Sequence, residues 1–176
     1  MNAPDLDAWL PRPQIRSRHG SHAAAPPAEL WHAAESVRLA DTRRLGRMVR
    51  WRIPGVSPQT TFRDLFREQP FIVLDEGDGW SVSGLVGKIW TLQSDYPELG
   101  DAAAFRAWDA PGTARVLFAH WVEPAEGGSA LFSEARVAGT SRSAALRLRA
   151  LWALVGTFER LIGGEALTLA AHRAEA

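Results

Sequence analysis

The chain has 176 residues, of which 46% are apolar and 23% are charged, a composition typical of one globular domain with a packed core. Acidic and basic residues balance at twenty each, which excludes a global field that would hold nucleic acid or an anionic membrane. The absence of cysteine excludes disulfides, thiolate nucleophiles and cysteine metal sites. No signal-peptide pattern and no run of about 18 apolar residues is present, so we expect a cytoplasmic protein without membrane insertion.

The first part of the chain predicts one strand followed by small helices. After an irregular segment over residues 1–14, weak alternation from Ile15 predicts a strand that stops at a Pro-Pro pair. Pro27 then suits the first turn of an amphipathic helix, and a second short helix is expected to begin at the N-cap residues near Asp41. A third helix carries Phe66 on its apolar side, either as a lid over a cavity or as a plain cover of the core.

The middle of the chain predicts antiparallel strands. Two strand runs surround Gly77–Gly79, two more surround a Pro-Gly turn over residues 110–113, and a last hairpin surrounds Gly127 and Gly128. Glycine within the second of these predicted runs, at Gly84 and Gly87, indicates a bulge or curvature of the sheet.

A long amphipathic helix is expected from about Ser141 to the end of the chain. Its apolar stripe includes Leu148, Trp152 and Val155, and a Gly-Gly pair at 163–164 favours a kink or a break. A sheet with one apolar face needs a cover, and this helix is the large apolar surface left to supply it. We therefore expect a single α+β domain over residues 15–176, with a curved antiparallel sheet wrapped around the C-terminal helix and small helices after the first strand.

Four segments carry a resemblance to a known superfamily. They are "RSRHGSHAAAPPAELWHAA", "GLVGKIW", "FRAWDAPGTARVLFAHWVEP" and "SALFSEARV", in this order and spacing. Together they resemble the helix-grip superfamily of START domains, the birch-pollen allergen fold and bacterial polyketide cyclases, often labelled SRPBCC, and in particular its uncharacterised bacterial members. The resemblance runs from about Leu10 to the C-terminus. It implies a cavity between sheet and terminal helix that holds apolar molecules, but it supplies no reaction.

The last predicted hairpin determines which polar residues can act together. Across a two- or four-residue loop, even-numbered positions pair with odd-numbered ones. His120 then shares an apolar face with Ser133 and Ala135, while Glu134 lies on the opposite face with Arg136 or Arg115 as a surface partner. A His–Glu proton relay is therefore not expected here.

The candidate ligand-binding residues follow from the apolar face and its cover. His120 is either the polar anchor of a ligand or a satisfied core residue. Lys88, the only lysine, is either an anionic anchor or a solvent-exposed residue at a strand end. The full set is Val116, Phe118, His120, Ser133, Ala135, Lys88, Trp90, Phe66, Trp152 and Val155.

Three functions are compatible with the sequence. The preferred one is binding of a small hydrophobic or amphipathic molecule, with no cofactor and no catalytic residue. The alternatives are a cyclase or dehydratase that uses His120 as a base, and a protein-interaction module. His19 and His22 face opposite ways on a strand and make a poor metal site, and the arginines of "RRLGRMVRWR" form either a solvated helix face or a contact with an anionic partner. The sequence predicts no oligomeric state.

Overall fold

The computed structural model describes residues 3–91, 95–162 and 164–176, and at residue 52 and residues 154–162 it describes the backbone alone. In chain order its elements are β1 (Ile15–Ala23), α1 (Pro27–Ser36), a short 3-10 helix η1 (Leu39–Asp41), α2 (Leu45–Arg52), α3 (Phe62–Leu65), β2 (Ile72–Gly77), β3 (Trp80–Gly87), α4 (Ala102–Ala107), β4 (Ala114–Ala125), β5 (Gly128–Gly139), α5 (Arg142–Ile162) and α6 (Glu165–Ala174). This order confirms the predicted α+β helix-grip class.

The strands form one curved antiparallel sheet of five strands in the order β1-β5-β4-β3-β2. The strands from β2 to β5 follow the chain across the sheet, and β1 closes the far edge by pairing with β5. That pairing runs from Ile15 opposite Val137 to Ala23 opposite Ser129. The first strand of the chain therefore lies beside the last one.

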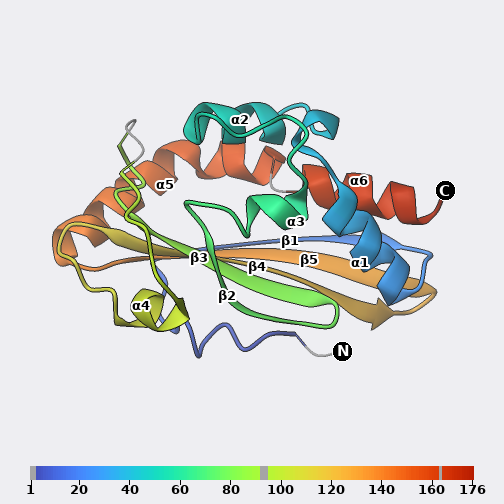
Figure 1. Cartoon of the computed structure of the whole chain (residues 1–176), viewed down its shortest axis with the longest axis horizontal. Coiled ribbons are helices and arrows are strands. Elements are labelled where there is room, and N and C mark those ends of the chain that lie inside the picture. Colours follow the sequence, from blue (N-terminus) through green and yellow to red (C-terminus); the bar gives the residue numbers. More distant parts are fainter. Residues whose placement is uncertain (1–2, 92–94, 163) are drawn as a thin grey trace.

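Both faces of the sheet are covered (Figure 1). On the helix face lie α1, α2, α3, α5 and α6; on the outer face lie α4 and the N-terminal segment over residues 3–14. Because side chains alternate across a strand, neighbouring residues of β4 belong to different cores. Val116 packs with Leu85 and Leu148 on the helix face, whereas Leu117 packs with Leu10 and Phe105 on the outer face.

The predicted strand before the Pro-Gly turn is wrong, because α4 occupies that place. The Asp101 side chain caps this helix by accepting a hydrogen bond from the backbone N–H of Ala104 at 2.7 Å. Three alanines with high helix propensity follow the cap, and Phe105 is fully buried. The turn itself is present, with Gly112 at φ +75.

Gly84 serves close packing rather than a bulge. Residues Trp80–Gly87 of β3 pair with β4 without a register shift, and the irregularity lies in β2, between Val73 and Asp75. A Cβ added at Gly84 would lie 2.7 Å from the Phe105 ring and 2.9 Å from a methyl group of Leu74. The glycine thus lets α4 approach the outer face of the sheet.

Gly84→Ala is expected to lower the free energy of unfolding by about 2 kcal/mol, because the Phe105 ring must move within a packed core. The loss is measured by urea unfolding. Gly100→Ala is the matched control, since a Cβ there would meet nothing within 4 Å. An equal change in the two variants would contradict the packing role of Gly84.

The helices α2 and α6 are joined through a carboxylate. The Glu165 side chain accepts hydrogen bonds from the backbone N–H groups of Arg43, Arg44 and Leu45 at 2.7–3.0 Å, which caps the N-terminus of α2 from another element. The predicted helix start near Asp41 is therefore wrong: η1 ends there and α2 begins at Leu45. Burial raises the pKa of Glu165, but the three N–H donors and the Arg44 charge outweigh this and hold the pKa below its usual value.

The predicted break of the terminal helix is confirmed, since α5 ends at Ile162 and α6 begins at Glu165. After the break, α6 packs against α1, where Leu30 meets Leu167 and Ala170 in a separate apolar cluster. The terminal helix therefore covers the sheet in two pieces rather than one.

Candidate functional site

The hairpin of β4 and β5 has the predicted register. Ala125 pairs with Gly128 across a two-residue loop, and His120 pairs with Ser133. Glu134 pairs with Ala119 and lies on the outer face, so the sheet separates it from His120. The structure confirms that these two residues form no catalytic pair.

A cavity of about 320 Å³ lies between the helix face and the helices α2, α3 and α5. Four strands contribute to its wall. It is lined mainly by apolar and aromatic side chains, with a few polar ones: Ile15, Ser17, His19, Leu45, Met48, Val49, Ile53, Phe62, Leu65, Phe66, Phe71, Leu85, Ile89, Tyr96, Val116, Phe118, His120, Ser133, Ala135, Val137, Trp152 and Leu167. We call this space the main cavity.

The main cavity brings together most of the residues that the sequence predicts to bind a ligand. Those placed in its wall are Val116, Phe118, His120, Ser133, Ala135, Phe66 and Trp152. Phe66 makes ring contacts with Phe71 and Phe118, at centroid distances of 5.2 and 5.4 Å. The side chain of Val155 lies outside the described ones.

Lys88 and Trp90 do not line the main cavity. The Lys88 side chain is 45% exposed and its Nζ lies 3.2 Å from a carboxylate oxygen of Asp95, so the structure places it at the surface rather than in the cavity. Trp90 packs against the helix-face core without reaching the cavity wall. The reason is that β3 ends at Gly87, so its alternation does not continue to these residues.

A row of polar side chains crosses the helix face. The strand pairings place His19 of β1 opposite Ser133 of β5, Ser133 opposite His120 of β4, and His120 opposite Ser81 of β3. We call these four residues the polar row. His19 also lies 3.1 Å from the hydroxyl of Ser17, through its Nε2 atom.

The His120 ring is held by aromatic contacts and not by hydrogen bonds. Its centroid lies 4.6 Å from that of Phe66 and 6.2 Å from that of Phe62. Within the described part of the chain, no residue hydrogen-bonds to either ring nitrogen. Burial lowers the pKa of His120 to about 4, so the imidazole is neutral at neutral pH.

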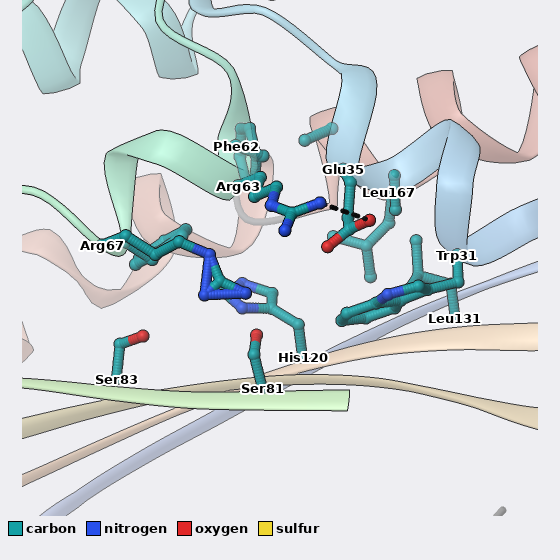
Figure 2. Close-up of a pocket in the computed structure, with 13 residues that line it drawn as sticks. Trp31, Glu35, Phe62, Arg63, Arg67, Ser81, Ser83, His120, Leu131 and Leu167 are labelled. Carbon is teal, nitrogen blue, oxygen red and sulfur yellow. Dashed lines mark ion pairs between the residues drawn. The ribbon is translucent and has the colours of Figure 1, made fainter. Parts of the chain in front are cut away.

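A second, smaller pocket of about 50 Å³ adjoins the main cavity at His120 (Figure 2). His120, Phe62, Phe66 and Leu167 line both spaces. Ser81 and Ser83 rise from β3 into this side pocket, and Arg63 reaches toward Glu35 of α1, with N–O at 3.6 Å. We call this space the side pocket; side chains of α1 and α3 also line it.

β1 and α2 also contribute to the cavity wall, which the sequence did not predict. Ser17 and His19 project from β1, while Met48 and Val49 project from α2. Alternation along β1 predicts that Ile15, Ser17 and His19 share a face, but which face depends on pairing with a strand more than one hundred residues away. Among the described residues, no group of three or more histidine, aspartate or glutamate side chains could hold a metal ion.

Glu134 belongs to a buried ionic cluster on the outer face, not to the surface. It is 1% exposed and accepts hydrogen bonds from Arg136 Nε at 2.6 Å and from Arg16 at 3.0 Å. The predicted partner is thus correct, but the predicted surface setting is wrong, because the N-terminal segment covers this face. Burial raises the pKa of Glu134, but the two guanidinium groups outweigh it and hold that pKa below its usual value.

The arginines of α2 and of the turn before it point outward, away from the cavity. Arg43, Arg44, Arg47 and Arg50 are exposed, as is Trp51 at 67%. The same helix faces the cavity with Met48 and Val49, so α2 is amphipathic. No described helix is both long and apolar enough to cross a bilayer.

No family model matches the sequence, and neither does any curated protein. Among solved structures, the chain is similar to an uncharacterised protein from Rhizobium leguminosarum, with 13% identity and a TM-score of 0.39 over 90% of this chain and 99% of that one. It is also similar to Ara h 8.0201, with 12% identity and a TM-score of 0.31 over 91% of this chain and 97% of that one.

Proposed function

We propose that the chain is a cytoplasmic, bacterial member of the SRPBCC group. We further propose that it binds a small apolar or amphipathic molecule, lipid-like or polyketide-like, in the main cavity. The observation that supports this is the cavity itself. Its volume of about 320 Å³ lies within the range of small-ligand pockets, and its wall is mostly apolar with a few polar groups. Small residues, Ser133 and Ala135, sit where larger ones would close the space.

A cyclase or dehydratase is the second candidate, favoured by the buried, neutral His120 in the cavity wall. A base of this kind works best when a second group orients its ring and accepts or returns the proton. Among the described residues no carboxylate is hydrogen-bonded to His120, and Glu134 lies across the sheet. Binding without chemistry is therefore the function that we prefer. An interaction module would have no need of a cavity.

Ala135→Leu tests ligand binding. Leucine at this position would occupy part of the main cavity, so the affinity for the neutral fluorescent probe phenylnaphthylamine is expected to fall at least tenfold, while thermal stability stays the same or rises. Fluorescence titration gives the affinity, and a thermal melt gives the stability.

Ala103→Leu is the matched control, because Ala103 is exposed on α4 at the other face of the sheet. It should bind the probe as the unmodified protein does. Probe binding that is unchanged in Ala135→Leu would place the probe elsewhere, and no binding by the unmodified protein at any accessible concentration would remove support for a ligand-binding cavity. Mass spectrometry of protein purified from its native host then looks for a retained apolar molecule.

A further inference from the structure

The polar row marks one place in the main cavity where a polar ligand atom can bind. Its four side chains lie side by side across four strands; His19, Ser133 and His120 line the main cavity, and Ser81 lines the adjoining side pocket. The other polar side chains of the wall are Ser17, which lies beside His19, and the aromatic residues Tyr96 and Trp152. A ligand with one polar group would therefore be oriented by this row, with its apolar body against the aromatic side chains of α3 and β4.

The two histidines of the row differ in their hydrogen-bond partners. His19 already has the Ser17 hydroxyl at 3.1 Å. His120 lies at the junction of the main cavity and the side pocket, and its ring makes aromatic contacts rather than hydrogen bonds within the described part of the chain. Because the His120 side chain is only partly buried and no described group hydrogen-bonds its ring nitrogens, a ligand oxygen placed at this junction would supply the hydrogen bond that His120 lacks.

The charges around the cavity restrict the kind of polar group that the ligand can carry. No described aspartate, glutamate, lysine or arginine lines the main cavity. At the side pocket the guanidinium groups already have carboxylate partners: Arg63 pairs with Glu35, and Arg67 pairs with Glu76 at 2.6 Å. An ionised ligand group at His120 would thus lose its water without gaining a counter-charge.

We propose that the occupant of the main cavity is an uncharged molecule with an apolar body and one hydroxyl or carbonyl oxygen, and that this oxygen binds at the junction between His120, Ser133 and Ser81. This inference rests on the proposed function and adds the chemical class of the ligand. The neutral state of the buried imidazole fits it, since a neutral histidine can donate one hydrogen bond and accept another.

The test compares three aromatic molecules of nearly the same shape: naphthol, naphthalene and naphthoate. Each competes with phenylnaphthylamine for the protein at neutral pH. Naphthol is expected to bind roughly three- to tenfold more tightly than naphthalene, which is the contribution of one hydrogen bond, and at least tenfold more tightly than naphthoate. If naphthalene equals naphthol, or naphthoate matches it, the inference is wrong while the binding function stands. If none of the three displaces the probe, the binding function itself fails.

Two kinds of variant locate the oxygen. His120→Phe keeps an aromatic ring and should retain naphthalene binding while losing the preference for naphthol. Ser133→Ala removes a single hydroxyl of the row and should reduce that preference without affecting folding, which keeps the test informative if His120→Phe is unstable. His22→Phe is the control, because His22 lies on the other face of β1, exposed and 3.1 Å from the Glu126 carbonyl. A naphthol preference that survives in both His120→Phe and Ser133→Ala would overturn the assignment.

Discussion

Arg136→Met is expected to lower the free energy of unfolding by about 3–5 kcal/mol, because it leaves Glu134 buried with a single, largely exposed partner, Arg16. Arg136 also ties down the N-terminal segment, donating to the Leu10 carbonyl at 3.1 Å and pairing with Asp7. Its removal therefore affects the ionic cluster and the cover of the outer face together. Urea unfolding at neutral pH measures the loss.

The contrast with an exposed ion pair isolates the role of burial. Arg67 and Glu76 are as close as Arg136 and Glu134, with N–O distances of 2.6 Å in both pairs, but their side chains are 29% and 50% exposed. Arg67→Gln should therefore cost only about 0–1 kcal/mol. The double variant Glu134→Leu with Arg136→Met should regain part of the lost stability, because it removes the unpaired charge. Similar losses in Arg136→Met and Arg67→Gln would show that burial is not what makes the first pair important.

The hairpin of β4 and β5 shows what local sequence can determine. Strand alternation and a glycine-containing two-residue loop together allow one parity of pairing, and this alone separates His120 from Glu134. The same information could not reveal that Glu134 is buried. Burial there depends on the N-terminal segment and α4 packing on the outer face, which are contacts between distant parts of the chain.

The cavity shows the same division between local and distant information. His120, Ser133 and Ala135 could be placed together because they lie on adjacent strands of one hairpin. For Lys88 the sequence allows either an anionic anchor or a solvent-exposed residue at a strand end. The structure shows the exposed residue, because β3 ends at Gly87, where a Cβ would lie 2.2 Å from the carbonyl oxygen of Asp95. The polar row could not be seen in the sequence, since it joins residues of four strands that only the sheet brings into line.

His120 is expected to make the stability of the protein depend on pH in a defined window. The pKa of the folded state, about 4, lies below the ordinary value of 6.5, so the unfolded chain binds more protons between these two values. The contribution of His120 to the free energy of unfolding is therefore fully present above about pH 6.5. It is lost as the pH is lowered, by about 2 kcal/mol at pH 5 and about 3 kcal/mol at pH 4. His120→Phe removes this titration, so its stability should change less between neutral pH and pH 5.

Measurements at pH 5 and above separate the titration of His120 from the titration of the carboxylates. The pKa values of Glu134 and Glu165 in the folded state lie below the ordinary 4.5, so the stability that they contribute is present above that value and is lost only at lower pH. His22→Phe is the matched variant for the loss of an imidazole, because His22 is exposed and lies on the other face of β1. Parallel curves of stability against pH for His120→Phe and the unmodified protein would mean that the His120 ring takes up a proton inside the cavity at mildly acidic pH. A cavity wall that carries a charge at His120 would favour an anionic ligand over the neutral one proposed.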